Sequence, residues 1–250
     1  MIASPGIRRW PAIFSILGPA VKSLSQALGE LLYPPACLSC ANMAVSESCR
    51  NLCPDCWRQI LQAEVPPVVS GDSAHGFAWH LAAWHYGSVI RDVIAAMKYH
   101  DHRSLAAALG DLAAHRLHER ADTIIPRARR TNWLLVPVPL HPRRRRERGF
   151  NQSELIALSL SRCWNIPVAS HALRRVRYTR SQASLAATER ASNLHDAFSS
   201  SRNNVVTGKS IILVDDVMTT GATARACAAV LHSMKAATVS VLTLARVTSA

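Results

Sequence analysis

The sequence predicts an α/β protein, in which a parallel sheet flanked by helices follows a small metal-binding module. Two observations predict this class. From Phe77 onward, short apolar runs typical of buried strands alternate with segments of helical periodicity. Before them, four cysteines occur as two Cys-x-x-Cys pairs. A chain of 250 residues that is 49% hydrophobic has enough apolar side chains for one such domain and an appendage.

The predicted strands and helices alternate along the chain. The strands are expected at 78–86, 133–138, 211–214 and 238–244, and the helices at 88–99, 104–118, 151–164 and 223–234. Strands that alternate with helices pair in parallel, because a parallel connection needs a crossover that a helix supplies. Both faces of the sheet are therefore predicted to be covered.

We expect three domains along the chain. They are an amphipathic helix over 1–36, a four-cysteine zinc-binding module over 37–63 and the α/β domain over 77–250, with a linker over 64–76. The apolar positions of the first part recur at steps of three and four, and they are Leu17, Val21, Leu24, Leu28 and Leu31. A weak secretory signal is the alternative reading of this part, since Arg8 and Arg9 precede a mildly apolar stretch. No apolar run reaches the roughly 20 residues that span a bilayer, so no transmembrane segment is predicted and the chain is expected to be soluble or only peripherally attached. We expect it in the cytoplasm.

The chain is strongly basic, with a formal net charge of +13. Of its 29 lysines and arginines four are lysines, which leaves 25 arginines. Arginine suits bidentate contact with phosphates. The charge therefore indicates a polyanionic partner, either nucleic acid or a small molecule that carries pyrophosphate. A solvated arginine-rich surface without a partner is the alternative.

The cysteine pairs predict a structural zinc site. Its candidate ligands are Cys37, Cys40, Cys53 and Cys56. Two Cys-x-x-Cys turns supply four thiolates in the tetrahedral arrangement that zinc prefers, and four protein ligands leave no position open for catalysis. Disulfides are the alternative and would imply an oxidising compartment. Cys49 is either a spare ligand or a free thiol. Cys163 and Cys227 are expected in the core.

The segment 211–223 combines a buried strand, two acids, a short hydroxyl-rich turn and a helix start. Asp215 and Asp216 repel phosphate but suit the vicinal hydroxyls of a ribose, directly or through Mg²⁺. The turn and helix start suit an anion, because backbone N–H groups point outward there. The candidate phosphate-binding residues are Thr219, Thr220, Gly221, Ala222 and Thr223. The pattern predicts a ligand with a sugar diol at one end and a phosphate at the other. The alternative is an ordinary capped turn.

A basic loop is expected at residues 141–152, on the same sheet edge as the phosphate turn. Arg143–Arg146 can clamp a pyrophosphate, or follow a nucleic-acid backbone with Phe150 as a stacking surface. A solvated run of charge is the alternative. The basic stretch around Arg174, Arg175, Arg177, Tyr178 and Arg180 is expected on the same surface.

The segment 211–223 resembles the phosphoribosyl pyrophosphate (PRPP) motif of type I phosphoribosyltransferases. Other segments narrow the resemblance to the ComF (competence protein F, GntX-like) family. They are the cysteine turns, residues 86–99, 136–140 and 148–152, and Gln182, Arg190, Asn193 and Phe198. The family implies a five-stranded parallel phosphoribosyltransferase-type core with a hood, preceded by a zinc-ribbon-like module.

The resemblance also implies binding partners and roles. Asp215 and Asp216 would contact the ribose hydroxyls of PRPP, with Mg²⁺, and residues 219–223 its 5-phosphate. Arg148, Asn151 and Gln152 lie in a family motif and are expected to bind substrate. Some family members are tied to DNA uptake in natural competence, which implies single-stranded DNA and a competence helicase as partners.

Three functions are consistent with these residues. The first is a phosphoribosyltransferase that transfers the pentosyl group of PRPP to an acceptor, for example in nucleoside metabolism. The second is a non-catalytic, nucleic-acid-binding accessory of DNA uptake. The third is a regulator that senses PRPP without turnover. No general base is evident from the sequence, so no catalytic residue is assigned.

Overall fold

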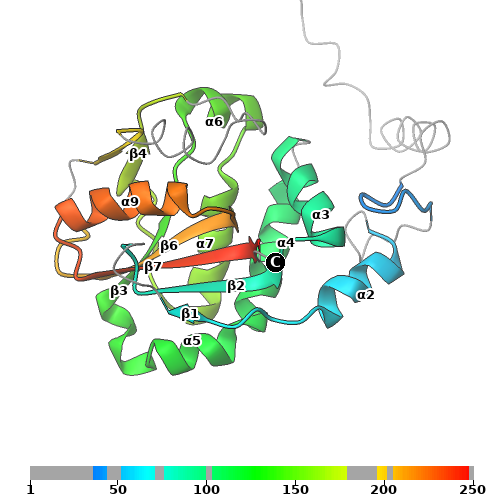
Figure 1. Cartoon of the computed structure of the whole chain (residues 1–250), viewed down its shortest axis with the longest axis horizontal. Helices are drawn as coiled ribbons and strands as arrows, with labels where there is room; N and C mark the ends of the chain where they lie inside the picture. The colour runs from blue at the N-terminus through cyan, green and yellow to red at the C-terminus, as the bar shows by residue number, and fades with distance from the viewer. Residues whose placement is uncertain are drawn as a thin grey trace, which may run out of the picture. The chain divides into compact units, whose positions relative to one another are not determined.

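The computed structural model of the chain describes residues 36–43, 52–70, 76–99, 103–178, 196–201 and 205–247 (Figure 1). The predicted helix over 1–36 lies almost wholly outside these ranges. The described elements are α2 (Pro54–Gln62), β1 (Val69–Ser70), β2 (Trp79–His85), α3 (Ser88–Tyr99), α4 (Arg103–Arg116), α5 (His118–Ile124), the 3-10 helix η3 (Arg127–Asn132), β3 (Trp133–Pro137), α6 (Pro142–Arg148), α7 (Gln152–Trp164), β4 (Leu173–Arg175), β5 (Phe198–Ser200), β6 (Ser210–Met218), α9 (Ala222–Ser233) and β7 (Thr238–Arg246).

A five-stranded sheet organises the α/β part, in the order β1-β2-β7-β6-β3. The pairs β2–β7, β7–β6 and β6–β3 are parallel, which confirms the predicted fold class. The expectation of five parallel strands is wrong at one edge, because β1 pairs with β2 in antiparallel fashion. A short connection suffices for an antiparallel neighbour, so two residues of the predicted linker join the sheet. β4 and β5 form a separate antiparallel pair.

The central strand β6 is longer than the sequence predicts. Its apolar run ends at Val214, yet the strand continues to Met218, which pairs with Arg246 of β7. The pairing with β3 ends at Val214, so the parallel ladder with β7 alone carries β6 on to Met218. Asp215 and Asp216 therefore belong to the strand itself.

Helices cover both faces of the sheet, with α9 on one face and α7 and α4 on the other (Figure 1). Under α9, the buried side chains of Cys227 and Leu231 pack with Leu213 and Val241. On the other face α4 approaches α7 closely at Gly110. A Cβ atom at Gly110 would lie 2.9 Å from Cβ of Ser159, which explains a glycine inside a helix.

Two helical predictions need correction. The helix expected over 104–118 ends at Arg116, and a second helix, α5, follows. No proline or glycine separates the two helices, so the sequence does not indicate the break. The basic loop over 141–152 contains the helix α6. His141 caps this helix by accepting a hydrogen bond from the backbone N–H of Arg143, Pro142 is its first residue, and Gly149 ends it at φ 77°.

The chain divides into two compact units, Met1–Pro54 and Asp55–Ala250, with a boundary inside the predicted span 37–63 of the zinc module. The predicted domain limits themselves stay predictions. Within the described ranges, no helix is long and apolar enough to cross a bilayer.

Candidate functional site

The predicted acidic pair lies toward the carboxyl end of β6, the sheet edge at which open parallel sheets bind ligands. Asp216 is 5% exposed. Its Oδ2 atom lies 3.0 Å from Nζ of Lys98, in the last turn of α3. The same oxygen accepts a hydrogen bond of 3.2 Å from Nε2 of Gln152, the first residue of α7. A nearly buried carboxylate is thus balanced by one cation and one amide.

Asp215 is held by different groups. Its Oδ1 atom accepts hydrogen bonds from the hydroxyl of Ser153 at 3.1 Å and from the backbone N–H of Asp216 at 2.9 Å. Burial, followed by the charge of Asp216, raises the pKa of Asp215 from its ordinary 3.8 to about 7. For Lys98, burial opposes the charged form, but the charge and hydrogen bond of Asp216 together with the charges of Asp215 and Tyr86 outweigh it and raise the pKa of the ammonium.

The start of α7 brings the groups that hold the acids into place. Asn151 caps α7 by accepting a hydrogen bond from the backbone N–H of Ser153, and its Nδ2 donates to the carbonyl of Val138 at 3.1 Å. Arg148 donates to Oε1 of Gln152 at 3.1 Å. Asn151 therefore joins the end of β3 to the helix start, and Arg148 orients the amide that binds Asp216. Direct contact of these residues with a substrate stays a prediction.

The predicted phosphate turn connects β6 to α9 over residues 219–221. Gly221 adopts a left-handed conformation at φ 72°, immediately before α9. The left-handed backbone favours glycine, whereas a Cβ atom there would lie 3.0 Å from Cε of Met218, a flexible side-chain end that can shift. Thr219 and Thr220 are exposed, whereas Thr223 lies in the first turn of α9. The first N–H groups of α9 have no intrahelical partner, which leaves them available to an anion.

Three residues of this site were not named from the sequence. Lys98 and Ser153 contact the acids, and Arg225 donates from NH1 to the carbonyl of Thr220 at 2.8 Å. The sequence signal for Lys98 is its place in the segment 86–99, which contributes to the ComF resemblance. Its contact with Asp216 joins residues 118 positions apart in sequence, so only the tertiary structure shows it.

A basic surface lies on α6 and the segment after β4. The guanidinium carbons of Arg143 and Arg144 lie 5.1 and 6.0 Å from the ring centroid of Tyr178, and His141 contacts the same ring edge-on at 5.1 Å. Tyr178 is 38% exposed. The two predicted basic stretches therefore do share a surface, here called the α6–Tyr178 surface.

Two expectations about the basic stretches change. Phe150 is 5% exposed and cannot stack on a base, so that prediction is wrong. It follows the left-handed Gly149, which ends α6, and its apolar ring is buried in the core. Tyr178 is the exposed aromatic residue instead. Arg175 lies 5.3 Å from the ring centroid of Phe198, while Arg180 is outside the described residues.

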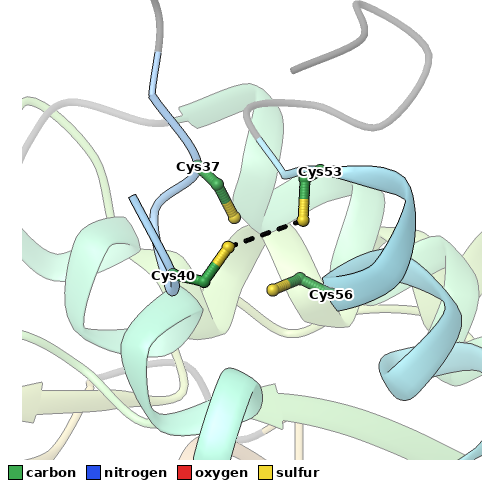
Figure 2. Close-up of side chains that lie close together, drawn as sticks. All are labelled: Cys37, Cys40, Cys53 and Cys56. Atoms are coloured by element: carbon green, nitrogen blue, oxygen red, sulfur yellow. Dashed lines mark hydrogen bonds between the residues drawn. The ribbon is translucent and has the colours of Figure 1, made fainter. Parts of the chain in front are cut away.

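The four predicted zinc ligands come together around the start of α2 (Figure 2). Their sulfur atoms all lie within 4.8 Å of one another, and those of Cys40 and Cys53 are 3.6 Å apart. Tetrahedral zinc with Zn–S bonds of about 2.3 Å places sulfurs about 3.8 Å apart, so the cluster fits this ion. The structure has free thiols at these positions, against the disulfide alternative.

The electrostatics of Cys37 favour a thiolate ligand. Burial acts to raise its pKa, but hydrogen bonds from the backbone at Cys40, Cys53 and Ser39 outweigh burial and lower the pKa to about 6. Metals bind the thiolate form. Of the other cysteines, Cys227 is fully buried as predicted. Cys163 is only partly buried, with Sγ 3.9 Å from Nδ1 of His118, and Cys49 is outside the described residues.

Comparison with known proteins places the chain in a family. Residues 155–250 match the family model of the phosphoribosyl transferase domain. Over 211 residues the chain is 32% identical to DNA utilization protein YhgH of Escherichia coli, which covers 84% of this chain and 89% of that protein. The chain belongs to the ComF family of phosphoribosyltransferase-like proteins.

Two further ComF relatives match over shorter spans. Competence protein F of Haemophilus influenzae is 37% identical over 125 residues, which are 48% of this chain and 55% of that protein. Competence protein ComFC of Bacillus subtilis is 40% identical over 116 residues, which are 46% of this chain and 45% of that protein. The chain thus spans about half the length of each. The acids and the turn of this ComF protein lie inside the phosphoribosyl transferase match, whereas Lys98 and Gln152 lie before it.

The raised pKa of Asp215 predicts a pH-dependent stability. Its folded-state pKa of about 7 lies above the ordinary 3.8, so the carboxyl stabilises the fold below pH 3.8, and this stabilisation is lost as the pH rises to 7. Asp215→Asn cannot ionise and keeps both acceptor contacts. We expect its melting temperature to exceed that of the wild type by a few degrees at pH 8 and by less at pH 5. Asp111→Asn, on the surface, is the control and should not show this dependence on pH. If Asp215→Asn raises the melting temperature by the same amount at pH 5 and pH 8, the prediction is contradicted.

Proposed function

We propose that this ComF protein binds the ribose 5-phosphate group of PRPP, or of a related ribose phosphate, at the end of β6. The observation that carries the proposal is the position of Asp215 and Asp216 near the end of β6, separated by two residues from the turn of Thr219 to Gly221, inside the span that matches the phosphoribosyl transferase domain. Carboxylates accept hydrogen bonds from a ribose diol. The glycine turn and the helix start provide backbone donors for the phosphate.

Charge around the turn supports the same ligand orientation. Arg225 lies beside the turn and bonds the carbonyl of Thr220, so a cation stands next to the proposed phosphate position. The two carboxylates stand where a phosphate would be repelled. A ribose phosphate placed with its phosphate at the turn and its diol at the acids therefore meets complementary groups at both ends.

With PRPP as donor, the reaction class is pentosyl transfer to an acceptor, with release of pyrophosphate. Mg²⁺ would accompany PRPP, because it binds the phosphate oxygens of substrates in preference to an all-protein site. A cytoplasmic location belongs to the same proposal, since a metal site of four free thiols suits a reducing compartment.

DNA binding is a second candidate function, favoured by a specific observation. Two guanidinium groups flank the exposed ring of Tyr178 on the α6–Tyr178 surface, and similar proteins are named for competence and DNA utilization. Arginines that follow a phosphate backbone and an aromatic ring for base stacking are the usual elements of a single-strand surface. We propose that single-stranded DNA contacts this surface during DNA uptake or use.

Ligand-induced stabilisation tests the ribose phosphate site. We expect PRPP with Mg²⁺, at about 100 times its Kd, to stabilise the zinc-loaded protein by about 2.7 kcal/mol, a shift of a few degrees in thermal unfolding. Asp215→Asn/Asp216→Asn should lose the shift, because the negative charge that strengthens the hydrogen bonds accepted from the diol is removed. Its binding of single-stranded DNA should persist.

The matched control is Asp111→Asn/Asp55→Asn, which removes two exposed carboxylates away from β6. It should keep the full shift. Equal stabilisation of the Asp215→Asn/Asp216→Asn variant and the wild type by PRPP would show that the ligand binds elsewhere.

A further inference from the structure

Lys98 brings a permanent positive charge to the acidic pair. Its Nζ atom lies 3.0 Å from Oδ2 of Asp216, and the Lys98 side chain is 26% exposed. Asp216 is the ion-pair partner of this lysine within the described part of the chain. The lysine lies in the last turn of α3, where the partial negative charge of the helix end also favours a cation.

The same oxygen of Asp216 has a second donor. Nε2 of Gln152 lies 3.2 Å from Oδ2, and Arg148 fixes the orientation of that amide through its Oε1 atom. Oδ2 is thus occupied from two sides, by an ammonium from α3 and an amide from α7. Both donors come from outside β6, so two elements of the fold converge on one carboxylate oxygen.

This arrangement does not fit Mg²⁺ on Oδ2 of Asp216. Magnesium requires near-octahedral oxygen ligands at about 2.0–2.1 Å and releases its water reluctantly. An ion on Oδ2 would have to displace Lys98 or lie against its ammonium, and like charges at such a distance repel strongly in a partly buried site. Lys98 already gives the acidic pair the positive charge that a divalent ion would otherwise provide.

We propose that Lys98 is the built-in cation of this site, a positioning residue that balances Asp216 so that a ribose diol binds at Asp215 and Asp216 without a divalent ion. The proposal rests on the proposed ribose phosphate site. An ammonium has three N–H donors, and the contact with Asp216 uses one. The ammonium of the partly exposed Lys98 side chain therefore has further N–H groups, from which a ribose hydroxyl or an anionic substituent at C1 can accept a hydrogen bond.

Ribose 5-phosphate is the suitable probe, because it lacks the pyrophosphate that would bind Mg²⁺ on its own. Its Kd is measured by titration calorimetry on the zinc-loaded full chain, with and without Mg²⁺. Magnesium is omitted rather than chelated, since a chelator would also extract zinc. We expect the wild-type Kd to agree within about twofold in the two buffers.

Replacing Lys98 should create a magnesium requirement. Without Mg²⁺, Lys98→Met should bind ribose 5-phosphate about tenfold or more weakly, because two neighbouring carboxylates lose their counter-charge. Added Mg²⁺ should restore binding, since Oδ2 of Asp216 becomes accessible to the ion. Lys98→Arg keeps the charge and should need no Mg²⁺. Lys209→Met removes another lysine, next to the start of β6, and should behave as the wild type.

A direct metal titration supplies a readout without any sugar. Mn²⁺, followed by electron paramagnetic resonance, should bind Lys98→Met and lose this binding in Lys98→Met/Asp216→Asn, while the wild-type pair stays free of Mn²⁺. Wild-type ribose 5-phosphate binding that requires Mg²⁺, or Mn²⁺ bound at the wild-type pair, overturns the role of Lys98. No ribose phosphate binding in either buffer, with or without Lys98, overturns the proposed function instead. If Lys98→Met fails to fold, the binding of ribose 5-phosphate to Lys98→Arg and the Mn²⁺ titration of the wild type still test the role of Lys98.

Discussion

Replacing Cys53 and Cys56 together by serine is expected to abolish zinc binding and to unfold the cysteine module. The wild type should contain one zinc ion per chain, held by four sulfurs that lie within 4.8 Å of one another. Apparent binding energies of structural zinc in small modules are about 10–16 kcal/mol, so losing two ligands removes more free energy than a small module can supply by packing.

The effect should extend to the α/β domain through α2. Nε1 of the buried Trp84 donates to the carbonyl of Ile60 at 3.0 Å, and NH1 of Arg116 donates to that of Leu61 at 2.9 Å. Cys56 lies in the first turn of the same helix. Loss of α2 would expose Trp84, so we expect a red-shifted tryptophan emission and a lower melting temperature.

Zinc content by mass spectrometry and thiol titration provide the measurement, and Cys163→Ser provides the matched control. Cys163 is partly buried on α7, outside the cluster, and its replacement should leave zinc content unchanged. A wild-type protein without zinc whose four cysteines resist thiol reagents until reduced would instead establish disulfides. Full zinc content in the double serine variant would remove these residues from the site.

Neutralising Arg144 and Arg146 is expected to weaken binding of single-stranded DNA about tenfold or more at low salt. Both are on α6, and Arg144 lies 6.0 Å from the ring centroid of Tyr178. Their neighbours Arg143 and Arg145 form ion pairs with Glu147 and Glu154, respectively. Replacing Arg143 and Arg145 would remove two positive charges and also leave these two carboxylates without their partners. Arg144→Gln/Arg146→Gln is therefore the cleaner variant.

The salt dependence distinguishes backbone contacts from a general loss of charge. Each phosphate contact to a single strand adds about 0.7 to the slope of log K against log salt, so two lost contacts should reduce its magnitude by about 1.4. Arg127→Gln/Arg129→Gln removes the same charge from η3, before the start of β3 and thus at the amino ends of the parallel strands. Asp122, the ion-pair partner of Arg127, keeps its pair with Arg130 in this variant. The variant should keep both affinity and slope. Equal effects of the two double variants would mean that net charge alone attracts DNA.

Where the signal is local, the sequence predicted the structure well. The strand, acid pair, glycine turn and helix start of residues 211–223 occur consecutively, and each follows from residue types a few positions apart. The same holds for the cysteines, because a Cys-x-x-Cys turn brings its own two sulfurs together. Gly221 is the clearest case, since a left-handed residue before a helix has few alternatives to glycine.

The sequence-based predictions were wrong where the structure of a segment depends on contacts with distant parts of the chain. The sequence predicts a loop where α6 occurs, because its run of four arginines is interpreted as a charged loop. The helix signals around it are His141 as the cap, Pro142 at the first position and Gly149 at the end. It predicts an exposed Phe150 after a charged run, yet an apolar ring is stabilised by burial. The length of β6 also depends on β7, whose ladder extends β6 past Val214, where the pairing with β3 ends.

The sequence by itself determined the fold class, the four-cysteine centre and the acids and turn of the candidate ribose phosphate site, because each depends on short-range spacing or periodicity. Only the tertiary structure decided what surrounds the acids. Lys98 on α3 and Gln152 on α7 meet at one oxygen of Asp216, although they are far apart in the chain. A local pattern cannot specify such a meeting, because it arises from the packing of helices against the sheet, and that packing gives the site its charge balance.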